Sequence, residues 1–144
     1  MIPLLFLATS WFTETQGVSV EGNVKFYDPG LMPSVAVNRG YIDDVSEYDD
    51  WLDTEGIDGG ASLLRRGDLG RKFIVIWPDG SITYHISIDC ANQGHYDRRV
   101  ELGDIAEVDF AVAQEMHMDG PVKAKVVFLD QLELMLRSGP LAAR

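Results

Sequence analysis

Apolar and polar residues alternate along several short stretches of this chain, as they do in half-buried β-strands. The alternation is clear over residues 18–27 and again over residues 122–129. Residues 73–77 are strongly apolar, and residues 82–89 follow after the turn sequence Pro-Asp-Gly at 78–80. Proline, aspartate and glycine between two β-rich stretches favour a tight turn. We therefore predict a β-hairpin here, flanked by further strands.

A helical pattern is clear in one place. Residues 109–117 carry apolar side chains at helical spacing, and Asp109 is well placed to cap the helix at its N-terminus. Residues 31–39 allow either a short helix or a loop that covers the barrel into which these strands are expected to fold. The C-terminal tail, residues 131–144, allows one or two helical turns.

An acidic segment interrupts the strands at residues 41–60. It holds eight acidic residues and no basic one. No register of this segment supplies the oxygen ligands, glycine and final glutamate of a helix-loop-helix calcium site. We expect a solvated insertion that Tyr48, Trp51 and Leu52 pin to the rest of the protein.

Several short strands, one short helix and no β-α-β rhythm predict a small mainly-β barrel. A chain of 144 residues fits one such domain. The expected division is an apolar N-terminal arm or signal remnant over residues 1–16, the barrel over residues 17–130 with its acidic insertion, and the tail.

Charge and composition limit the kinds of partner that the protein is expected to bind. Twenty-three acidic residues against twelve Lys and Arg give a formal net charge of −11, which repels phosphate backbones, so no nucleic acid is expected. The single cysteine, Cys90, excludes an internal disulfide, and we expect a small buried thiol there. The apolar N-terminus is too short to span a bilayer, so no transmembrane segment is predicted.

Polar residues gather where the strand 82–89 ends. Asp89 is followed within eight residues by Cys90, His95 and Asp97, in what we interpret as a loop. Asp89 either works as a carboxylate at the mouth of a site or bonds backbone amides where the strand meets the loop. The rise along a strand separates His85 from Asp89 by roughly 13 Å, which is too far to share one ion. We predict no metal and no cofactor.

The motifs and their order resemble a known family. FYDPG ends an early strand, GDLGRKFIVIWPDGSITYHISID forms the hairpin, and EVDFAVAQEMHMDGPVKAKVVFL supplies a helix and a last strand. This order is similar to the double-psi β-barrel domain of the rare lipoprotein A family and, more distantly, to expansins and the related barrel endoglucanases. The resemblance implies a six-stranded double-psi β-barrel with one short helix. It also implies binding to glycan chains and, as in some members, peptidoglycan cleavage by lytic transglycosylation.

The resemblance assigns roles to two aspartates. Asp89 falls at the family's catalytic aspartate and is the candidate acid/base. Asp109 falls at the aspartate that opens the helix, which acts as the acid in the endoglucanase relatives. The family's histidine falls near Leu64, which cannot transfer a proton, and the Asp-Arg-Gly-Pro loop lacks its arginine and glycine here.

The sequence thus predicts a domain that binds peptidoglycan-type polysaccharide, with or without catalysis, in the cell envelope or outside the cell. Trp51 and Tyr96 are expected to be exposed for stacking on sugar rings. The expected glycan-binding residues are Tyr27, Trp51, His95, Tyr96 and Asp97. The alternative is a non-enzymatic structural subunit of a virion, filament or envelope assembly, with self-assembly through residues 1–12.

Overall fold

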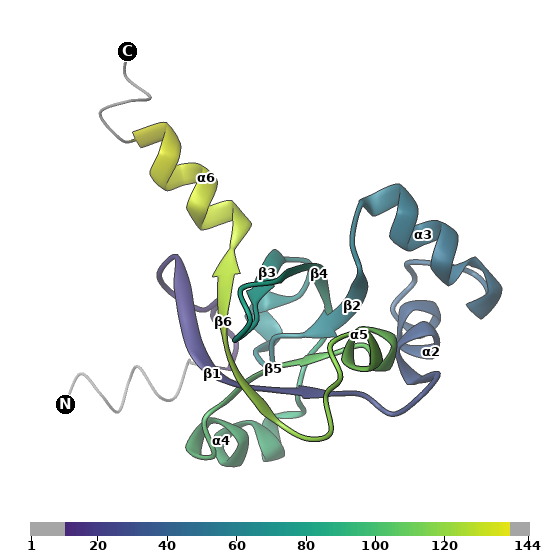
Figure 1. Ribbon diagram of the computed structural model, residues 1–144, viewed down its shortest axis with the longest axis horizontal. Coiled ribbons are helices and arrows are strands. Elements are labelled where there is room, and N and C mark those ends of the chain that lie inside the picture. The colour runs from purple at the N-terminus through teal and green to yellow at the C-terminus, as the bar shows by residue number, and fades with distance from the viewer. Residues whose placement is uncertain (1–10, 139–144) are drawn as a thin grey trace.

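The computed structural model describes residues 11–138, in which six strands close into a small barrel (Figure 1). The strands are β1 (Ser19–Phe26), β2 (Gly59–Ser62), β3 (Lys72–Ile76), β4 (Ile82–Asp89), β5 (Asp104–Val108) and β6 (Val122–Phe128). Their order around the barrel is β1-β5-β2-β4-β3-β6. The prediction of a small, mainly-β, six-stranded barrel is confirmed.

The pairing of the strands is mixed. β1 pairs with β5 and β2 pairs with β4 in parallel, whereas the other four pairs are antiparallel. The predicted hairpin is β3 and β4, which pair from Ile76 and Ile82 at the turn to Lys72 and Ile86. Pairs that join strands far apart in sequence bring the ends of β1, β2, β4 and β5 together, and the candidate site forms there.

The barrel interior holds the apolar residues of the alternating stretches. Along β6 the buried positions alternate at first, and β3 buries every second residue. Side chains point to opposite faces of a strand in turn, so this period places one set inside. The fully buried members of this core include Val24, Ala61, Phe73, Val75, Ala106, Val108 and Val126.

More helices surround the barrel than the one predicted. They are α2 (Leu31–Asn38), η1 (Val45–Glu47), α3 (Tyr48–Glu55), η2 (Arg66–Asp68), α4 (Gln93–Glu101), α5 (Phe110–Glu115) and α6 (Leu129–Ser138). The predicted helix is α5, and Asp109 caps it by accepting a hydrogen bond from the amide of Ala111. The stretch that holds His95 and Asp97 was predicted as a loop, and this was wrong, because it forms α4.

The acidic segment packs on the barrel through its aromatic residues. Tyr48 is buried, and Trp51 and Leu52 pack against the apolar cluster that contains Met32 and Ile88. The acidic residues of α3 itself are exposed. The segment is therefore anchored on one face, with its charges in solvent.

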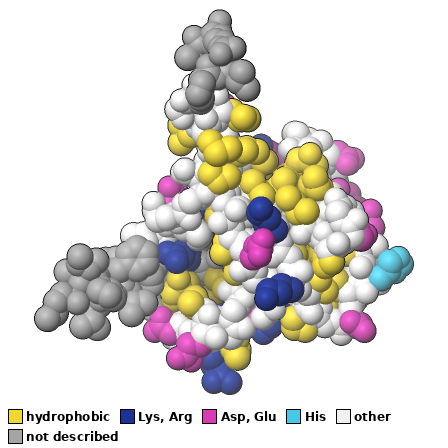
Figure 2. All heavy atoms as spheres, turned by 60° about the vertical axis from the view of Figure 1, so that its left-hand side comes forward, with side chains coloured by type: hydrophobic (Ala, Val, Ile, Leu, Met, Phe, Trp, Pro, Cys, Tyr) yellow, Lys and Arg dark blue, Asp and Glu magenta, His cyan; other side chains and the backbone are white. Residues whose placement is uncertain are grey.

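The C-terminal helix α6 projects from the barrel (Figure 1). Hydrophobic side chains gather along it and where it meets the barrel (Figure 2). Leu134, Met135 and Leu136 are each at least half exposed. Within residues 11–138 no helix has the length and apolar character needed to cross a membrane. Most of the predicted arm, residues 1–10, and residues 139–144 of the tail lie outside the described residues.

Candidate functional site

Three elements converge on the carboxylate of Asp89, the last residue of β4. The Tyr27 hydroxyl, just after β1, donates a 2.7 Å hydrogen bond to its Oδ2. Arg39 follows α2, and its Nη2 donates to Oδ1 at 2.8 Å in a salt bridge. Both carboxylate oxygens of Asp89 are therefore held, and one-fifth of the side chain stays exposed at 21%.

A second carboxylate lies on the other side of β2. Ser62, at the end of β2, pairs with Asp89 of β4 and with Glu107 of β5. Neighbouring strands are about 4.8 Å apart, so the backbones of the two acidic residues are separated by roughly 10 Å. Glu107 forms an ion pair with Arg99 of α4. Each of the two acidic side chains thus has its own arginine.

An open pocket of about 320 Å³ lies between the end of β1 and the start of α4. Its walls offer hydrogen-bond donors and acceptors, positive and negative side chains, the rings of Phe26 and Tyr27, and one leucine. The lining residues are Phe26, Tyr27, Asp28, Leu31, Cys90, Ala91, Asn92, His95, Arg99 and Glu107. Asp89 lies at the edge of the pocket. It is hydrogen-bonded to the lining residue Tyr27, and the next residue in the chain is the lining residue Cys90.

The contacts to Asp89 change the pKa values of its two hydrogen-bond partners. Burial, followed by the hydrogen bond to Asp89 and the charge of that carboxylate, raises the pKa of Tyr27 far above its usual value, so the phenol remains a donor. The hydrogen bond to Asp89 raises the pKa of Arg39 further above its already high value. Both oxygens of Asp89 therefore act as hydrogen-bond acceptors in this arrangement. A general acid must instead carry its proton into the reaction.

Asp109 lies apart from this pocket and is 4% exposed. Its Oδ2 accepts a 2.7 Å hydrogen bond from the hydroxyl of Tyr48, which in turn accepts one from the amide of Gly60. Burial, followed by the charge of Asp109, raises the pKa of Tyr48 far above its usual value. Asp109 therefore caps α5 and fastens the acidic segment to the barrel.

The structure separates the predicted glycan-binding residues. Tyr27 and His95 line the pocket, and Asp97 is exposed on α4 outside the lining. The expectation that Tyr96 is exposed was wrong, because its side chain is 4% exposed and packs against Leu64 and Ala91. Trp51 is half-buried, with its ring against Tyr41 and Tyr48. Tyr96 is therefore too buried to stack on a sugar ring.

Cys90 differs from the expected buried thiol. It is half-buried and lines the pocket, with Arg39 Nη2 3.9 Å from its sulfur. Among residues 11–138, no three His, Cys, Asp or Glu side chains are grouped closely enough to hold a metal ion. His85 is fully buried in the barrel, where it contacts the hydroxyl of Thr83 and the carbonyl of Gly59.

Four residues of the site were missed by sequence reasoning, namely Arg39, Ser62, Arg99 and Glu107. Each lies in a separate segment of the chain, and nothing local distinguishes it from an ordinary surface residue. Leu64, at the position of the family's histidine, is 2% exposed and has a φ of 70°. The barrel therefore offers no proton carrier at that position. Neither a protein-family model nor a curated protein matches this chain at a significant level of similarity.

Proposed function

We propose that this protein is a glycan-binding domain that holds peptidoglycan-type polysaccharide at the pocket beside Asp89, in the cell envelope or outside the cell. We propose further that its barrel is of the double-psi type and similar to the rare lipoprotein A family. The order of the sequence motifs supports this, and so do the two parallel pairs β1–β5 and β2–β4 within an otherwise antiparallel barrel.

The observation that carries the proposal is the fixed carboxylate of Asp89 at the edge of an open polar pocket. Sugar hydroxyls donate and accept hydrogen bonds at the same time, so a glycan site needs both kinds of partner at fixed positions. Of the lining residues, Glu107 supplies acceptors and Arg99 and Asn92 supply donors, and the carboxylate of Asp89 holds Tyr27 beside them. Phe26 adds an apolar edge against which the face of a sugar ring can lie.

The same contacts favour binding over cleavage. Both oxygens of Asp89 accept hydrogen bonds, from Tyr27 and Arg39, whereas lytic transglycosylation needs a residue that delivers a proton to the leaving oxygen. Leu64 supplies no second proton carrier. The proposed domain therefore retains the glycan without cutting it.

The test is a pulldown on purified peptidoglycan sacculi that also follows the release of soluble muropeptides. The wild type is expected to be retained without release. Asp89→Asn removes the carboxylate charge that holds Arg39 and Tyr27 beside the pocket and should weaken retention about tenfold or more, as expected for a lost charged hydrogen bond. Asp97→Asn is the matched control, because Asp97 is exposed nearby but does not line the pocket; it should bind like the wild type.

Two results would contradict the proposal. Muropeptide release that disappears in Asp89→Asn would make Asp89 a catalytic acid/base and the protein an enzyme. An absence of retention would reject the cell-wall assignment and leave the alternative, a structural subunit of an assembly. The exposed Leu134, Met135 and Leu136 of α6 favour that alternative, since a projecting helix with apolar residues can pack against another subunit.

A further inference from the structure

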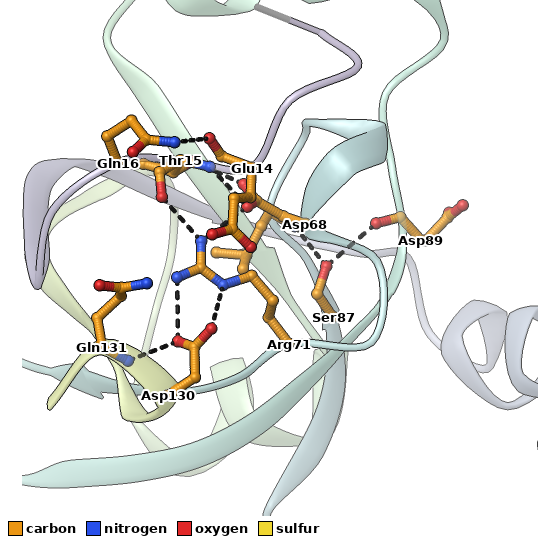
Figure 3. A network of polar contacts seen from close by, with 10 residues as sticks. Glu14, Thr15, Gln16, Asp68, Arg71, Ser87, Asp89, Asp130 and Gln131 are labelled. Atoms are coloured by element: carbon orange, nitrogen blue, oxygen red, sulfur yellow. Dashed lines mark hydrogen bonds and ion pairs between the residues drawn. The ribbon is translucent and has the colours of Figure 1, made fainter. Parts of the chain in front are cut away.

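Residues 11–16 form a strap that crosses the barrel surface ahead of β1 and is fastened at both ends. At one end the indole of Trp11 donates a 3.0 Å hydrogen bond to the carbonyl of Ala91. At the other end Thr15 donates twice to Asp68, from its amide at 2.8 Å and from its hydroxyl at 2.6 Å (Figure 3). Both oxygens of the Asp68 carboxylate are thus engaged by one residue of the strap.

The partners of Thr15 are buried charges. Asp68 is completely buried and Arg71 is 7% exposed. Arg71 donates to the carbonyl of Thr15 at 3.0 Å and to Asp68 at 2.9 Å, and it also pairs with Asp130 at the start of α6 (Figure 3). Removal of the strap would leave Oδ2 of Asp68 without its hydroxyl donor, and an unpaired buried carboxylate oxygen is costly. The site is therefore complementary to a peptide segment that presents an N–H, an O–H and a carbonyl at one residue.

The surface between the two ends is shaped for a backbone. A Cβ atom on Gly67 would lie 2.3 Å from the carbonyl carbon of Thr13 and 2.4 Å from the carbonyl oxygen of Phe12. Such distances are shorter than real contacts, so a side chain at Gly67 would push the strap away. The amide of Gly67 also donates to the carbonyl of Trp11. Close approach of two backbones explains why glycine stands at this position.

The barrel does not need the strap to complete its main core. The described residues that build or border that core begin at Val20. Gly17, between the strap and β1, has a φ of +88°, a conformation that glycine adopts without strain. The strap contacts a separate small cluster, in which Trp11 packs against Leu64, Ala91 and Tyr96. Detachment of the strap at Gly17 would therefore leave the main core of the barrel intact.

We propose that residues 64–71 together with Ala91 form a recognition site for a peptide with a tryptophan and, four residues later, a threonine. The chain's own strap occupies this site, so the proposed ligand is a separate peptide that competes with residues 11–16. The proposal is independent of glycan binding. The tethered strap competes with an added peptide at an effective concentration in the millimolar range. Weakening the strap reduces this competition, so an added peptide then binds measurably.

The test titrates a fluorescein-labelled peptide of residues 11–16, WFTETQ, with the full chain and follows fluorescence anisotropy. Thr15→Ala weakens the strap in the chain but leaves threonine in the peptide. This variant should bind the peptide about tenfold or more tighter than the wild type, because its own strap no longer supplies the charged hydrogen bond to Asp68. Glu14→Ala is the matched control, since Glu14 is an exposed residue of the same strap. It should behave like the wild type.

A peptide with alanine in place of the threonine that corresponds to Thr15 should bind the Thr15→Ala chain no more tightly than the wild type. This control changes only the peptide. Gly67→Ala combined with Thr15→Ala should also abolish binding. If Thr15→Ala does not fold by circular dichroism, Trp11→Ala weakens the other end of the strap and serves instead. Equal affinity of the weakened chain and the wild type, or equal binding of the two peptides, would overturn the proposal.

Discussion

His85 shows how a single buried polar residue is accommodated in this barrel. It lies on β4 with no exposed surface, its ring stacked on Phe73. Its two ring nitrogens contact the hydroxyl of Thr83 at 2.7 Å and the carbonyl of Gly59 at 3.1 Å. Burial lowers the pKa of His85 from 6.5 to about 4, because the charged imidazolium would lose its hydration inside the barrel.

This shift predicts a loss of stability in mild acid. Between pH 6.5 and about 4 the unfolded chain binds a proton at His85 that the folded chain does not. The stability that comes from keeping His85 neutral is therefore complete above pH 6.5 and is lost as the pH falls toward 4. The total loss corresponds to roughly 3 kcal/mol, with roughly 1 kcal/mol lost by pH 5.5. Urea unfolding at pH 7, 5.5 and 4.5 measures it.

His85→Gln provides the comparison, because glutamine can keep polar contacts but does not titrate. The variant should lose most of the pH dependence between 6.5 and 4, whatever its stability at pH 7. The same slope in both proteins would mean that another group is responsible. The prediction belongs to the residue scale, because one side chain and its immediate surroundings determine it.

At the scale of elements, polar side chains fasten the added helices to the barrel. Tyr48 at the start of α3 donates to Asp109 and accepts from the amide of Gly60, and so joins α3, α5 and β2. The hydrophobic cluster around Met32 and Ile88 covers the same junction. The acidic segment thus depends on one buried hydroxyl as well as on apolar contact.

Tyr48→Phe should lower the free energy of unfolding by about 1–3 kcal/mol, because it leaves a buried carboxylate oxygen and a backbone amide without this partner. The control is Tyr41→Phe, which removes a hydroxyl from an exposed ring of the same segment and should change stability by less than about 0.5 kcal/mol. Urea unfolding of the three proteins at pH 7 gives both values. Equal stability of all three would show that apolar packing alone holds the segment.

The elements differ in how far local sequence determines them. The β3–β4 hairpin was predicted because its turn residues and flanking apolar stretches lie next to one another in sequence. Helix α4 was predicted as a loop because its sequence is mostly polar. It is fixed by the cap at Asn92, which accepts from the amide of His95 at 3.0 Å, and by burial of Tyr96 against residues from elsewhere. Tertiary burial commonly outweighs weak helix propensity.

For the whole molecule, net charge is the dominant long-range term. The formal charge of −11 destabilises the compact state through self-repulsion, and salt screens charges over about 10 Å at 0.1 M. Raising NaCl from 20 mM to 300 mM at pH 7 should therefore raise the melting temperature, by about 3 °C for each kcal/mol of relieved repulsion.

The matched control is the same pair of salt concentrations at pH 4.5, close to the isoelectric point of the chain, where the effect should nearly vanish. Calorimetry at the four conditions separates the two cases. A lower melting temperature in salt at pH 7 would show that ion pairs such as Arg39–Asp89 stabilise the fold more than the overall repulsion destabilises it.

The sequence by itself determined strands β1, β3, β4 and β6, the hairpin, the capped helix α5 and the acidic character of the chain, whereas β2 was not predicted, because it begins inside the stretch taken as the acidic insertion. These depend on the period of apolar residues, on turn residues and on composition, all of which are local or additive along the chain. It also placed Asp89 at the end of a strand beside a polar stretch. The resemblance in motif order led to the expectation of a six-stranded barrel, which the closed structure confirmed.

Only the tertiary structure decided what surrounds Asp89. Tyr27, Arg39, Glu107 and Arg99 come from separate segments, and the parallel pairing of β1 with β5 and of β2 with β4 brings them together. Closing the barrel also decided that Tyr96 is buried and that the strap reaches the buried Asp68. Contacts such as Tyr27–Asp89 and Arg39–Asp89 join residues fifty or more positions apart and depend on strand order and register, which the local pattern of a single sequence does not contain.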